Sequence, residues 1–196
     1  MNLRTWPVND DVEIREMAMA DFRPHFQRLR PQLFKKNFEL HTSRILTPHE
    51  MELQKKLDAK MGETYQFCLV AYHKDEIIGW SFGRQVDRES FYMVNSAVMP
   101  DFRRKGIYSA LVERMVQEAA SQGFQIIFGR HVATNSPVIA AKLKLGFVIT
   151  GMELSDSYGQ LVHLSYYTNP TRRKIIAVRS GEMVPDEEIL SLMGSI

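Results

Sequence analysis

The chain has 196 residues and a formal net charge of +2 at pH 7, because 25 Lys and Arg residues nearly balance 23 Asp and Glu residues. This balance argues against a broad basic surface, so we expect no nucleic-acid partner. With 44% hydrophobic residues, the chain is long enough to fold as one domain around a substantial core. Its one cysteine, Cys68, lies in an apolar run, which excludes an internal disulfide and predicts a buried, unreactive thiol.

The sequence shows no pattern typical of export or of membrane insertion. Its first residues lack the apolar region of a signal peptide, and no stretch approaches the length of a membrane span. We therefore expect a cytoplasmic protein that has no membrane partner, and no residue pattern calls for a metal.

The first half of the chain predicts strands and helices in a mixed order. Residues 12–17 alternate as a half-buried strand, and apolar residues recur at helical spacing over residues 21–33. Thr47 and Glu50, with a proline after the threonine, form the pattern of a capped helix start, and that helix is expected to end near Gly62. A hairpin then follows, with strands over residues 66–72 and 77–86 joined by a polar turn.

The second half continues this mixed order. The expected elements are a strand over residues 93–98, a helix from 107 to Gly123, a strand over 125–132, a helix from Asn135 to Gly146, and an antiparallel pair over 147–154 and 161–167. Such an order predicts a mixed α/β or α+β domain over residues 1–169. Residues 170–196 read as an extension with an extra strand at 175–178 and a short helix at 186–193. We expect the extension to pack on the domain or on a partner subunit, so a homodimer is possible.

A basic loop joins the strand that ends at Val98 to the next helix. It contains Arg103, Arg104 and Lys105, followed by Gly106. A helix start has unpaired N–H groups and a partial positive charge, and a glycine lets backbone approach a ligand closely. The loop therefore suits a pyrophosphate, although a basic turn before a surface helix has the same composition. It lacks the glycines and the Lys-Ser/Thr pair of the common nucleotide-triphosphate and dinucleotide motifs.

This loop resembles the acyl-CoA pyrophosphate loop of the GNAT superfamily of N-acetyltransferases, Arg/Gln-x-x-Gly-x-Gly/Ala after a strand ending in Val-x-Pro. Arg103 and Gly106 match, and Tyr108 stands where the family has a small residue. Residues 135–147 are similar to a second family segment, Asn-x-x-Ala-x-x-x-Tyr-x-x-x-Gly-Phe. Asn135 then starts a helix beside the pantetheine arm, and Lys142 takes the place of the Tyr that often protonates the departing CoA thiolate.

The resemblance implies a central mixed, mostly antiparallel sheet with a splayed parallel strand pair, flanked by helices. The parallel strands are those ending at Val98 and Val132, and the coenzyme arm enters the gap between them. Acetyl-CoA is the implied acyl donor. The coenzyme-binding residues implied are Ala97, Val98, Met99, Arg103, Arg104, Lys105, Gly106, Ile107, Tyr108, Ser109, Asn135 and Lys142.

The candidate catalytic residues are Glu89, Asn95 and Tyr108. Glu89 starts the strand before the loop and suits a general base that acts directly or through water, or else is a solvated turn glutamate. Asn95 is polar in an apolar run and suits a substrate contact or a water anchor. Tyr108 is a proton donor that competes with Lys142, for which a solvated helix lysine is the alternative. His131 suits base work, or else is a hydrogen-bonded structural histidine.

The resemblance implies an N-acetyltransferase that moves an acetyl group from acetyl-CoA to a primary amine by direct attack in a ternary complex. The acceptor is a small-molecule or peptide amine, and the loops at residues 34–46 and 155–159 are expected to select it. A non-catalytic acyl-CoA-binding or sensor protein of the same fold is the alternative. A phosphate-binding module that recognises nucleic acid is a third hypothesis, which the balanced charge opposes.

Overall fold

An eight-stranded sheet forms the centre of the molecule in the computed structural model, which describes residues 4–34 and 44–193. The strands are β1 (Thr5–Asn9), β2 (Val12–Glu16), β3 (Gln66–His73), β4 (Glu76–Gln85), β5 (Ser90–Val98), β6 (Ile126–Val132), β7 (Val148–Ser155) and β8 (Gly159–Tyr167). The helices are α1 (Met19–Leu33), α2 (Pro48–Met61), α3 (Ile107–Ser121), α4 (Ser136–Lys144), α5 (Pro170–Arg179) and α6 (Glu187–Met193). These elements confirm the mixed α/β class.

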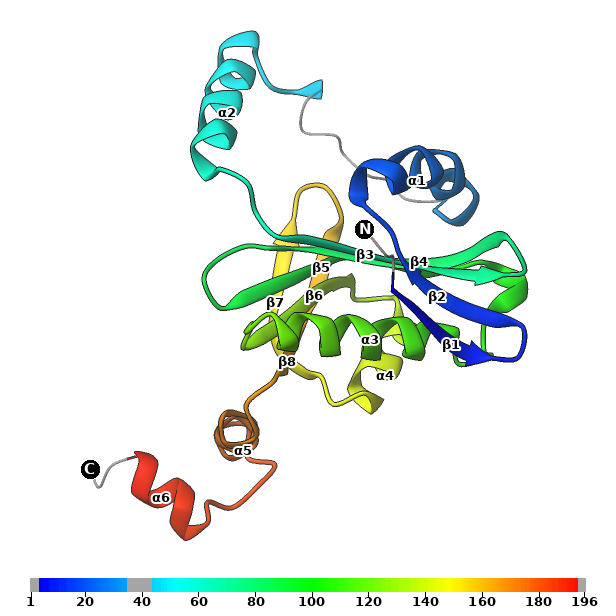
Figure 1. The fold of residues 1–196 in the computed structure, drawn as a ribbon. Coiled ribbons are helices and arrows are strands. Elements are labelled where there is room, and N and C mark those ends of the chain that lie inside the picture. The colour runs from blue at the N-terminus through cyan, green and yellow to red at the C-terminus, as the bar shows by residue number, and fades with distance from the viewer. Residues whose placement is uncertain (1–3, 35–43, 194–196) are drawn as a thin grey trace.

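The strand order is β1-β2-β3-β4-β5-β6-β8-β7, and the β5–β6 pair is parallel while the other neighbours are antiparallel. Helices α3 and α4 cover one face of the sheet, and α1 lies on the other (Figure 1). The sheet is therefore the middle layer of three. This arrangement explains why β3 is a nearly continuous buried run rather than an alternating one.

Each covering helix builds its own core against the sheet. On α3 the predicted apolar positions, such as Leu111 and Met115, are buried and pack on strand residues that include Phe91. On the α1 side, Phe22 packs near Trp80, with ring centroids 5.9 Å apart. Cys68 is buried in the same layer, and burial raises the pKa of its thiol. The prediction of a buried, unreactive thiol agrees with this environment.

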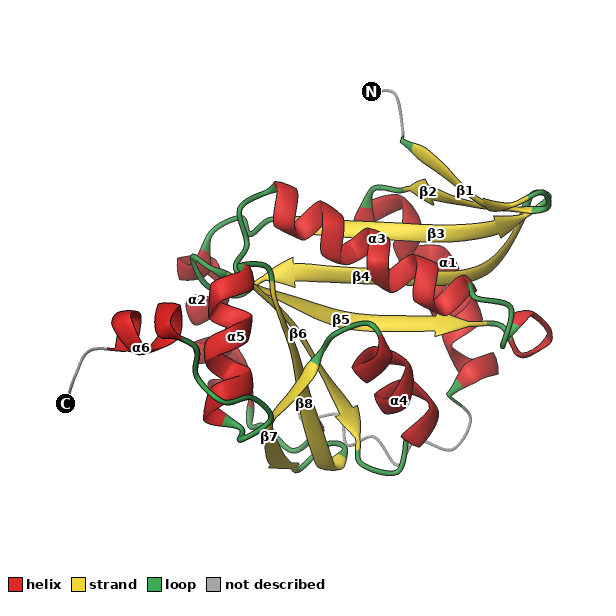
Figure 2. Cartoon of the chain, turned by 90° about the horizontal axis from the view of Figure 1, so that it is seen from below, coloured by secondary structure: helices red, strands yellow, loops and turns green. Residues whose placement is uncertain are grey.

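The parallel pair separates along its length. Pairing between β5 and β6 is limited to Ser90 with Ile126, Phe91 with Ile127 and Tyr92 with Phe128. Beyond this point residues 93–98 pair only with β4, and residues 129–132 only with β8. Figure 2 shows the two strands together at one end and diverging toward α4. The predicted splayed pair is therefore confirmed, and it leaves the backbone of each strand open along one edge.

The predicted secondary structure differs from the observed one in several places; β5, for example, begins at Ser90 rather than at residue 93. β1 was not expected, because its short segment Thr5–Asn9 contains Pro7 and its strand is formed only by pairing with β2. Residues 175–178, expected as a strand, belong to helix α5. The Asn169 side chain accepts a hydrogen bond from the Arg172 N–H, which caps that helix. Helix α1 begins two residues earlier than the expected start.

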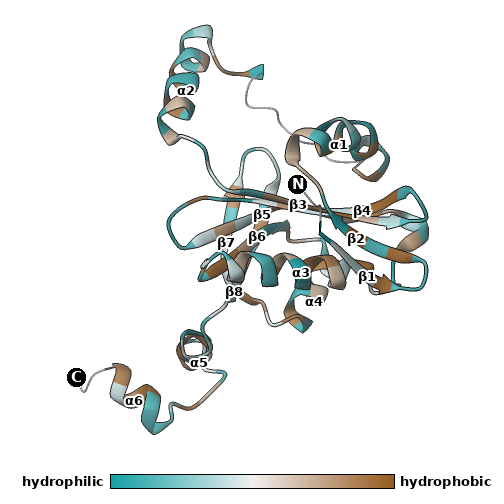
Figure 3. Ribbon diagram, in the orientation of Figure 1, coloured by the Kyte–Doolittle hydropathy of each residue, from teal (hydrophilic) through white to brown (hydrophobic). Residues whose placement is uncertain are grey.

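Helix α2 stands away from the sheet (Figure 1). Its predicted capping box is present: the Glu50 N–H donates to Thr47 Oγ1, and the Glu50 carboxylate accepts from the Thr47 N–H. None of its residues is buried, and Figure 3 shows both hydrophilic and hydrophobic colour along it. Among the helices described, none is both long and apolar enough to cross a membrane.

Candidate active site

A cavity of about 640 Å³ opens where β5 and β6 separate. Its size is typical of a site for a small molecule. The walls come from the middle of β5, the end of β6, helix α4, the end of α1 and the β7–β8 turn. The lining residues are Arg30, Phe34, Tyr92, Met93, Val94, Asn95, Ser96, Arg130, His131, Val132, Thr134, Asn135, Val138, Lys142, Tyr158 and Leu161. Phe34 and Tyr158 come from the predicted selection loops, of which residues 35–43 lie outside the described residues.

Lys142 reaches from α4 into the point where the two strands part. It is 0% exposed, and its Nζ lies 3.5 Å from Met93 Sδ and 4.5 Å from the ring centre of Phe147. A Cβ on Gly129 would lie 2.8 Å from this Nζ, so the glycine leaves the space that the ammonium occupies. Met93 and Gly129 are the first positions after the last β5–β6 pair. The alternative of a solvated helix lysine is therefore wrong.

The surroundings of Lys142 disfavour its charge. No carboxylate within the described parts of the chain forms an ion pair with it, and burial lowers the pKa of the ammonium to about 7. A buried ammonium without a counter-ion is costly unless it loses its proton or meets an anion. The group is therefore poised to exchange a proton near neutral pH.

His131 lies next to Lys142 in the same cavity. Its Nε2 is buried and has no hydrogen-bond partner in the described structure, and it lies 3.2 Å from the Cβ position of Gly129. Burial, and then the charge of Lys142, lower the pKa of His131 to about 3, so the imidazole is neutral at neutral pH. The alternative of a hydrogen-bonded structural histidine is not met at this nitrogen. Nε2 is instead a buried nitrogen without a partner among the described residues, on a side chain that lines the cavity.

Two of the predicted catalytic residues lie in different surroundings. Asn95 lines the cavity, and its Oδ1 accepts a hydrogen bond of 2.8 Å from Trp80 Nε1, which leaves its amide N–H groups as donors. Glu89 precedes the first residue of β5 and is not among the cavity residues. Its carboxylate pairs with Arg172 at 2.8 Å, and the hydrogen bond from Arg172 lowers its pKa. Asn95 is thus part of the cavity wall, whereas Glu89 is held outside the cavity.

The basic loop has the backbone that its sequence suggested. Gly106 is the N-cap of α3 with φ of 80°, and Arg104 also has a positive φ of 60°. Arg103 Nε donates to the Val98 carbonyl at 3.0 Å, and Lys105 Nζ lies 5.2 Å from the ring centre of Phe102. The first turn of α3 contains no acidic residue that would neutralise its positive end. The loop therefore presents basic side chains beside a free helix start.

The other predicted coenzyme residues lie in the first turn of α3 and in α4 with its N-cap. Ile107, Tyr108 and Ser109 form the first turn of α3, and the Tyr108 hydroxyl is buried without a hydrogen-bond partner in the described residues. Burial also raises its pKa. Asn135 is the N-cap of α4 as predicted, but its side chain makes no capping hydrogen bond and lines the cavity instead.

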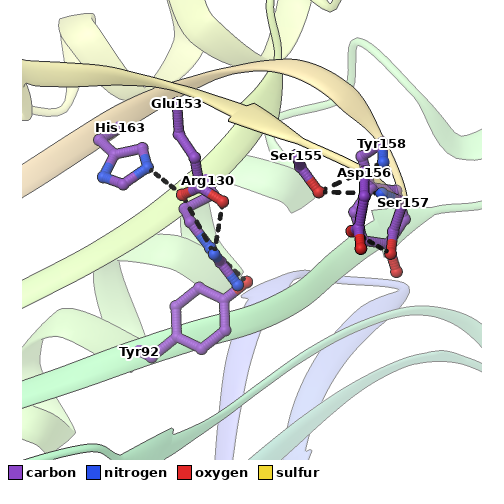
Figure 4. Close-up of polar contacts among 8 residues, drawn as sticks. All are labelled: Tyr92, Arg130, Glu153, Ser155, Asp156, Ser157, Tyr158 and His163. Carbon is purple, nitrogen blue, oxygen red and sulfur yellow. Dashed lines mark hydrogen bonds and ion pairs between the residues drawn. The ribbon is translucent and has the colours of Figure 1, made fainter. Parts of the chain in front are cut away.

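A polar network that the sequence did not single out adjoins the cavity, and two of its residues, Tyr92 and Arg130, belong to the lining (Figure 4). Arg130 Nε donates to the Tyr92 hydroxyl at 3.3 Å, and Arg130 Nη1 lies 3.1 and 3.2 Å from the two carboxylate oxygens of Glu153. His163 Nε2 lies 2.7 Å from Glu153. These residues come from four different strands, so only the sheet brings them together. The one signal in the sequence is that Arg130 precedes His131 on a strand expected to line the gap.

A three-layer fold with a splayed parallel pair, a cavity at the split and a basic helix start define the class of acyl-CoA N-acyltransferase folds. The model of the Acetyltransferase (GNAT) family matches residues 12–147, and the chain belongs to this family. No curated protein matches the sequence.

Solved structures agree with the fold. The chain is similar to yncA from Salmonella typhimurium, solved with acetyl-CoA, at 16% identity and a TM-score of 0.59 over 91% of this chain and 99% of that one. Ard1 from Thermoplasma volcanium has 20% identity and a TM-score of 0.58 over 81% and 99%. A GNAT acetyltransferase from Elizabethkingia anophelis with acetyl-CoA bound has 14% identity and a TM-score of 0.54 over 81% and 99%. At these identities the likeness supports the fold alone.

Proposed function

We propose that the protein is an N-acetyltransferase that moves an acetyl group from acetyl-CoA to a primary amine by direct attack in a ternary complex. The observation that carries the proposal is the split between β5 and β6, where a cavity is lined by the buried Lys142 and by His131, whose buried Nε2 has no hydrogen-bond partner among the described residues. Membership of the GNAT family supports the reaction class, and the acetyl-CoA complexes of two similar structures support the donor.

The proposed coenzyme site runs from the basic loop to the split. Its phosphates would lie at the start of α3, where Gly106 has no Cβ and Arg104 and Lys105 add positive charge. The pantetheine arm would follow the open edge of β5. Because the Met99 N–H donates to Ile78 on the β4 side, the alternation along the chain turns the Val98 N–H toward the open edge. That N–H is our candidate for polarising the thioester carbonyl.

The proposed reaction forms a bond between the acceptor nitrogen and the acetyl carbon and breaks the bond from that carbon to sulfur. The attacking amine must be neutral, and it loses one proton after attack, while the departing thiolate gains one. Lys142 lies at the floor of the cavity with a pKa of about 7, so both of its protonation states are present at neutral pH. We assign it the role of proton donor to the sulfur.

The other candidates take supporting roles in this proposal. Neutral His131 and the amide of Asn95 would orient the acceptor amine or a water that carries its proton away. Tyr108 would use its hydroxyl, which has no hydrogen-bond partner among the described residues, on the coenzyme. Glu89 has the least support, because it is held by Arg172 outside the cavity.

A non-catalytic acyl-CoA sensor is the second candidate. It is favoured by one observation: the described lining of the cavity contains no carboxylate that could act as a base. Binding and turnover separate the two functions. A sensor would bind acetyl-CoA and release no CoA with any amine.

The test combines acetyl-CoA titration by calorimetry with CoA release from a wide panel of primary amines. We expect binding by the wild-type protein and amine-dependent release of CoA. Lys142→Met should keep acetyl-CoA binding and lower kcat by about 10²-fold, the scale of a lost proton donor. Lys144→Met, on the exposed side of the same helix, is the matched control. Absence of acetyl-CoA binding would overturn both functions.

A further inference from the structure

The part of the cavity wall formed by β5 and β6 has a charge pattern that bears on the acceptor. We propose that the acceptor amine also carries an anionic group of the carboxylate class, and that Arg130 recognises this group. The inference rests on the proposed function, because it names the substrate class of that same site. Three observations on the described residues support it, and they concern Arg130, its neighbour Tyr92 and the charges of the cavity lining.

The first observation is that Arg130 is held in place while part of its guanidinium stays available. Its Nε donates to the Tyr92 hydroxyl, and its Nη1 contacts both oxygens of Glu153. Within the described structure Nη2 makes no hydrogen bond or ion pair, and the side chain is 37% exposed at the cavity. Two N–H groups are therefore free to bind a carboxylate. A fixed guanidinium loses little conformational entropy on doing so.

The second observation is that a donor lies beside these N–H groups. The Tyr92 hydroxyl accepts from Arg130, so its own proton remains for another acceptor. The Tyr92 ring is fixed by stacking on Phe128, with centroids 5.1 Å apart. Tyr92 lines the cavity, and Phe128 supports its ring from the neighbouring strand. A carboxylate that contacts Arg130 Nη2 could thus accept a second hydrogen bond from Tyr92.

Glu153 and His163 position the guanidinium without touching the cavity. Arg130 is paired with His163 in the β6–β8 ladder, and His163 in turn contacts Glu153 on β7. Hydrogen bonds from His163 and Arg130 lower the pKa of Glu153, so it stays ionised across the neutral range. The dyad is therefore a support for Arg130, and in Figure 4 it lies behind the guanidinium as seen from Tyr92.

The third observation is the sign of the lining. Among the described residues the cavity is lined by Arg30, Arg130 and Lys142 and by no Asp or Glu, and the Glu153 carboxylate that pairs with Arg130 lies outside the lining. A polyamine or an aminoglycoside would bring several cations next to these side chains, which is unfavourable at low dielectric. The same positive surroundings lower the pKa of a nearby acceptor ammonium and so favour the neutral amine that attack requires. An amine with a nearby carboxylate gains from both effects.

The test uses matched pairs of acceptors that differ only in charge. L-Phenylalanine, L-methionine and L-glutamine are compared with their amides, and spermidine represents polycations. The readouts are kcat/KM for CoA release and the rise in melting temperature in the presence of CoA. We expect at least one acid to exceed its amide by about ten-fold or more in kcat/KM, and spermidine to be the poorer acceptor.

Variants separate recognition from folding. Arg130→Gln should lower kcat/KM for the acid by about ten- to a hundred-fold, through KM rather than kcat, and leave the amide nearly unchanged. Glu153→Gln should weaken the same preference less, which a purely structural role would not do. Arg172→Gln, which also breaks an Arg–Glu pair but outside the cavity, is the matched control. Melting temperature and acetyl-CoA affinity check that each variant is folded.

The proposal is overturned if amides or spermidine equal the acids in the wild-type protein. It is also overturned if Arg130→Gln lowers both members of a pair equally, or if no acid of the panel binds or reacts. Failure of the proposed function is distinguishable from these outcomes. In that case acetyl-CoA does not bind, or an acid raises the melting temperature in an Arg130-dependent manner while no CoA is released.

Discussion

The two halves of β5 serve different purposes although they belong to one strand. The first half, Ser90–Tyr92, pairs on both edges, and Phe91 packs against Phe124 with ring centroids 5.4 Å apart. The second half pairs with β4 alone and borders a cavity in which His131 Nε2 is buried without a hydrogen-bond partner among the described residues. The first half satisfies its polar groups within the chain, whereas the second leaves them for a ligand.

This contrast indicates that the reacting groups of such a fold lie beside the open half of the strand. Buried polar groups are normally hydrogen-bonded, so those that are not need an explanation. His131 Nε2 is such a group among the described residues, and the Lys142 ammonium has only the weak acceptor Met93 Sδ. Both lie close to one position of β6, Gly129, where the sheet has just opened. The same feature that interrupts the ladder therefore provides the space for both groups. Two glycines, one beside each half of β5, allow the contrast to be tested by the same substitution.

The largest expected effect comes from Gly83→Ala beside the paired half. A Cβ at this position would collide with the Phe91 ring and lie 2.5 Å from the Tyr92 carbonyl oxygen. Neither the buried ring nor the ladder backbone can move freely. We expect a loss of about 2–4 kcal/mol in the free energy of unfolding, as measured by urea denaturation. A variant as stable as the wild type would show that this half of the sheet is less tightly packed than described.

Gly129→Ala beside the open half should act mainly on activity. Its Cβ would lie 2.8 Å from Lys142 Nζ and 3.2 Å from His131 Nε2, which are ends of side chains that can be displaced, and 3.6 Å from the Met93 carbonyl oxygen. We expect kcat to fall by about ten-fold or more, since small displacements of reacting groups are costly. The destabilisation should be smaller than that of Gly83→Ala. Equal losses of stability in both variants would remove the distinction between the two halves.

Lys142→Met should change how stability depends on pH. Because burial lowers the pKa of the folded protein's Lys142 from 10.5 to about 7, the unfolded chain binds more protons between these values. The contribution of Lys142 to stability therefore becomes more favourable as pH rises from about 7 to about 10.5. The Met variant lacks this pH-dependent contribution, so it should be more stable than the wild type at pH 7. The difference in stability between the two proteins should shrink toward pH 10. Melting temperatures across this range measure it, and a constant difference would contradict a lowered pKa.

The sequence predicted the features that depend on local patterns. The apolar spacing of α3, the capping box of Thr47 and the helix start at Gly106 are each determined by neighbouring residues, and the structure confirms them. The resemblance of residues 103–108 and 135–147 to the GNAT motifs also placed the split between two particular strands, and the pairing of β5 with β6 confirms it.

Features that depend on tertiary contacts could not be predicted in this way. Lys142 follows a helical pattern in which a lysine is normally solvated, and its burial results from the missing side chain of Gly129 on another element. Arg130 becomes a cavity residue only because strands far apart in sequence bring Tyr92 and Glu153 beside it. Residues 175–178 have an apolar run typical of a strand, but the cap at Asn169 starts a helix there.

The smallest expected effect comes from Glu89→Gln at the start of the paired half. The Glu89 side chain is 44% exposed and pairs with Arg172, and such an exposed pair contributes little to stability. Because the carboxylate lies outside the cavity, we expect kcat to stay within about two-fold of wild type, with no change in its pH profile. A general base would behave differently, since its removal lowers kcat by about 10²-fold or more and abolishes a limb of that profile. Arg172→Gln releases the carboxylate without removing it, so loss of activity in Glu89→Gln but not in Arg172→Gln would return Glu89 to the catalytic residues and extend the active site to both halves of β5.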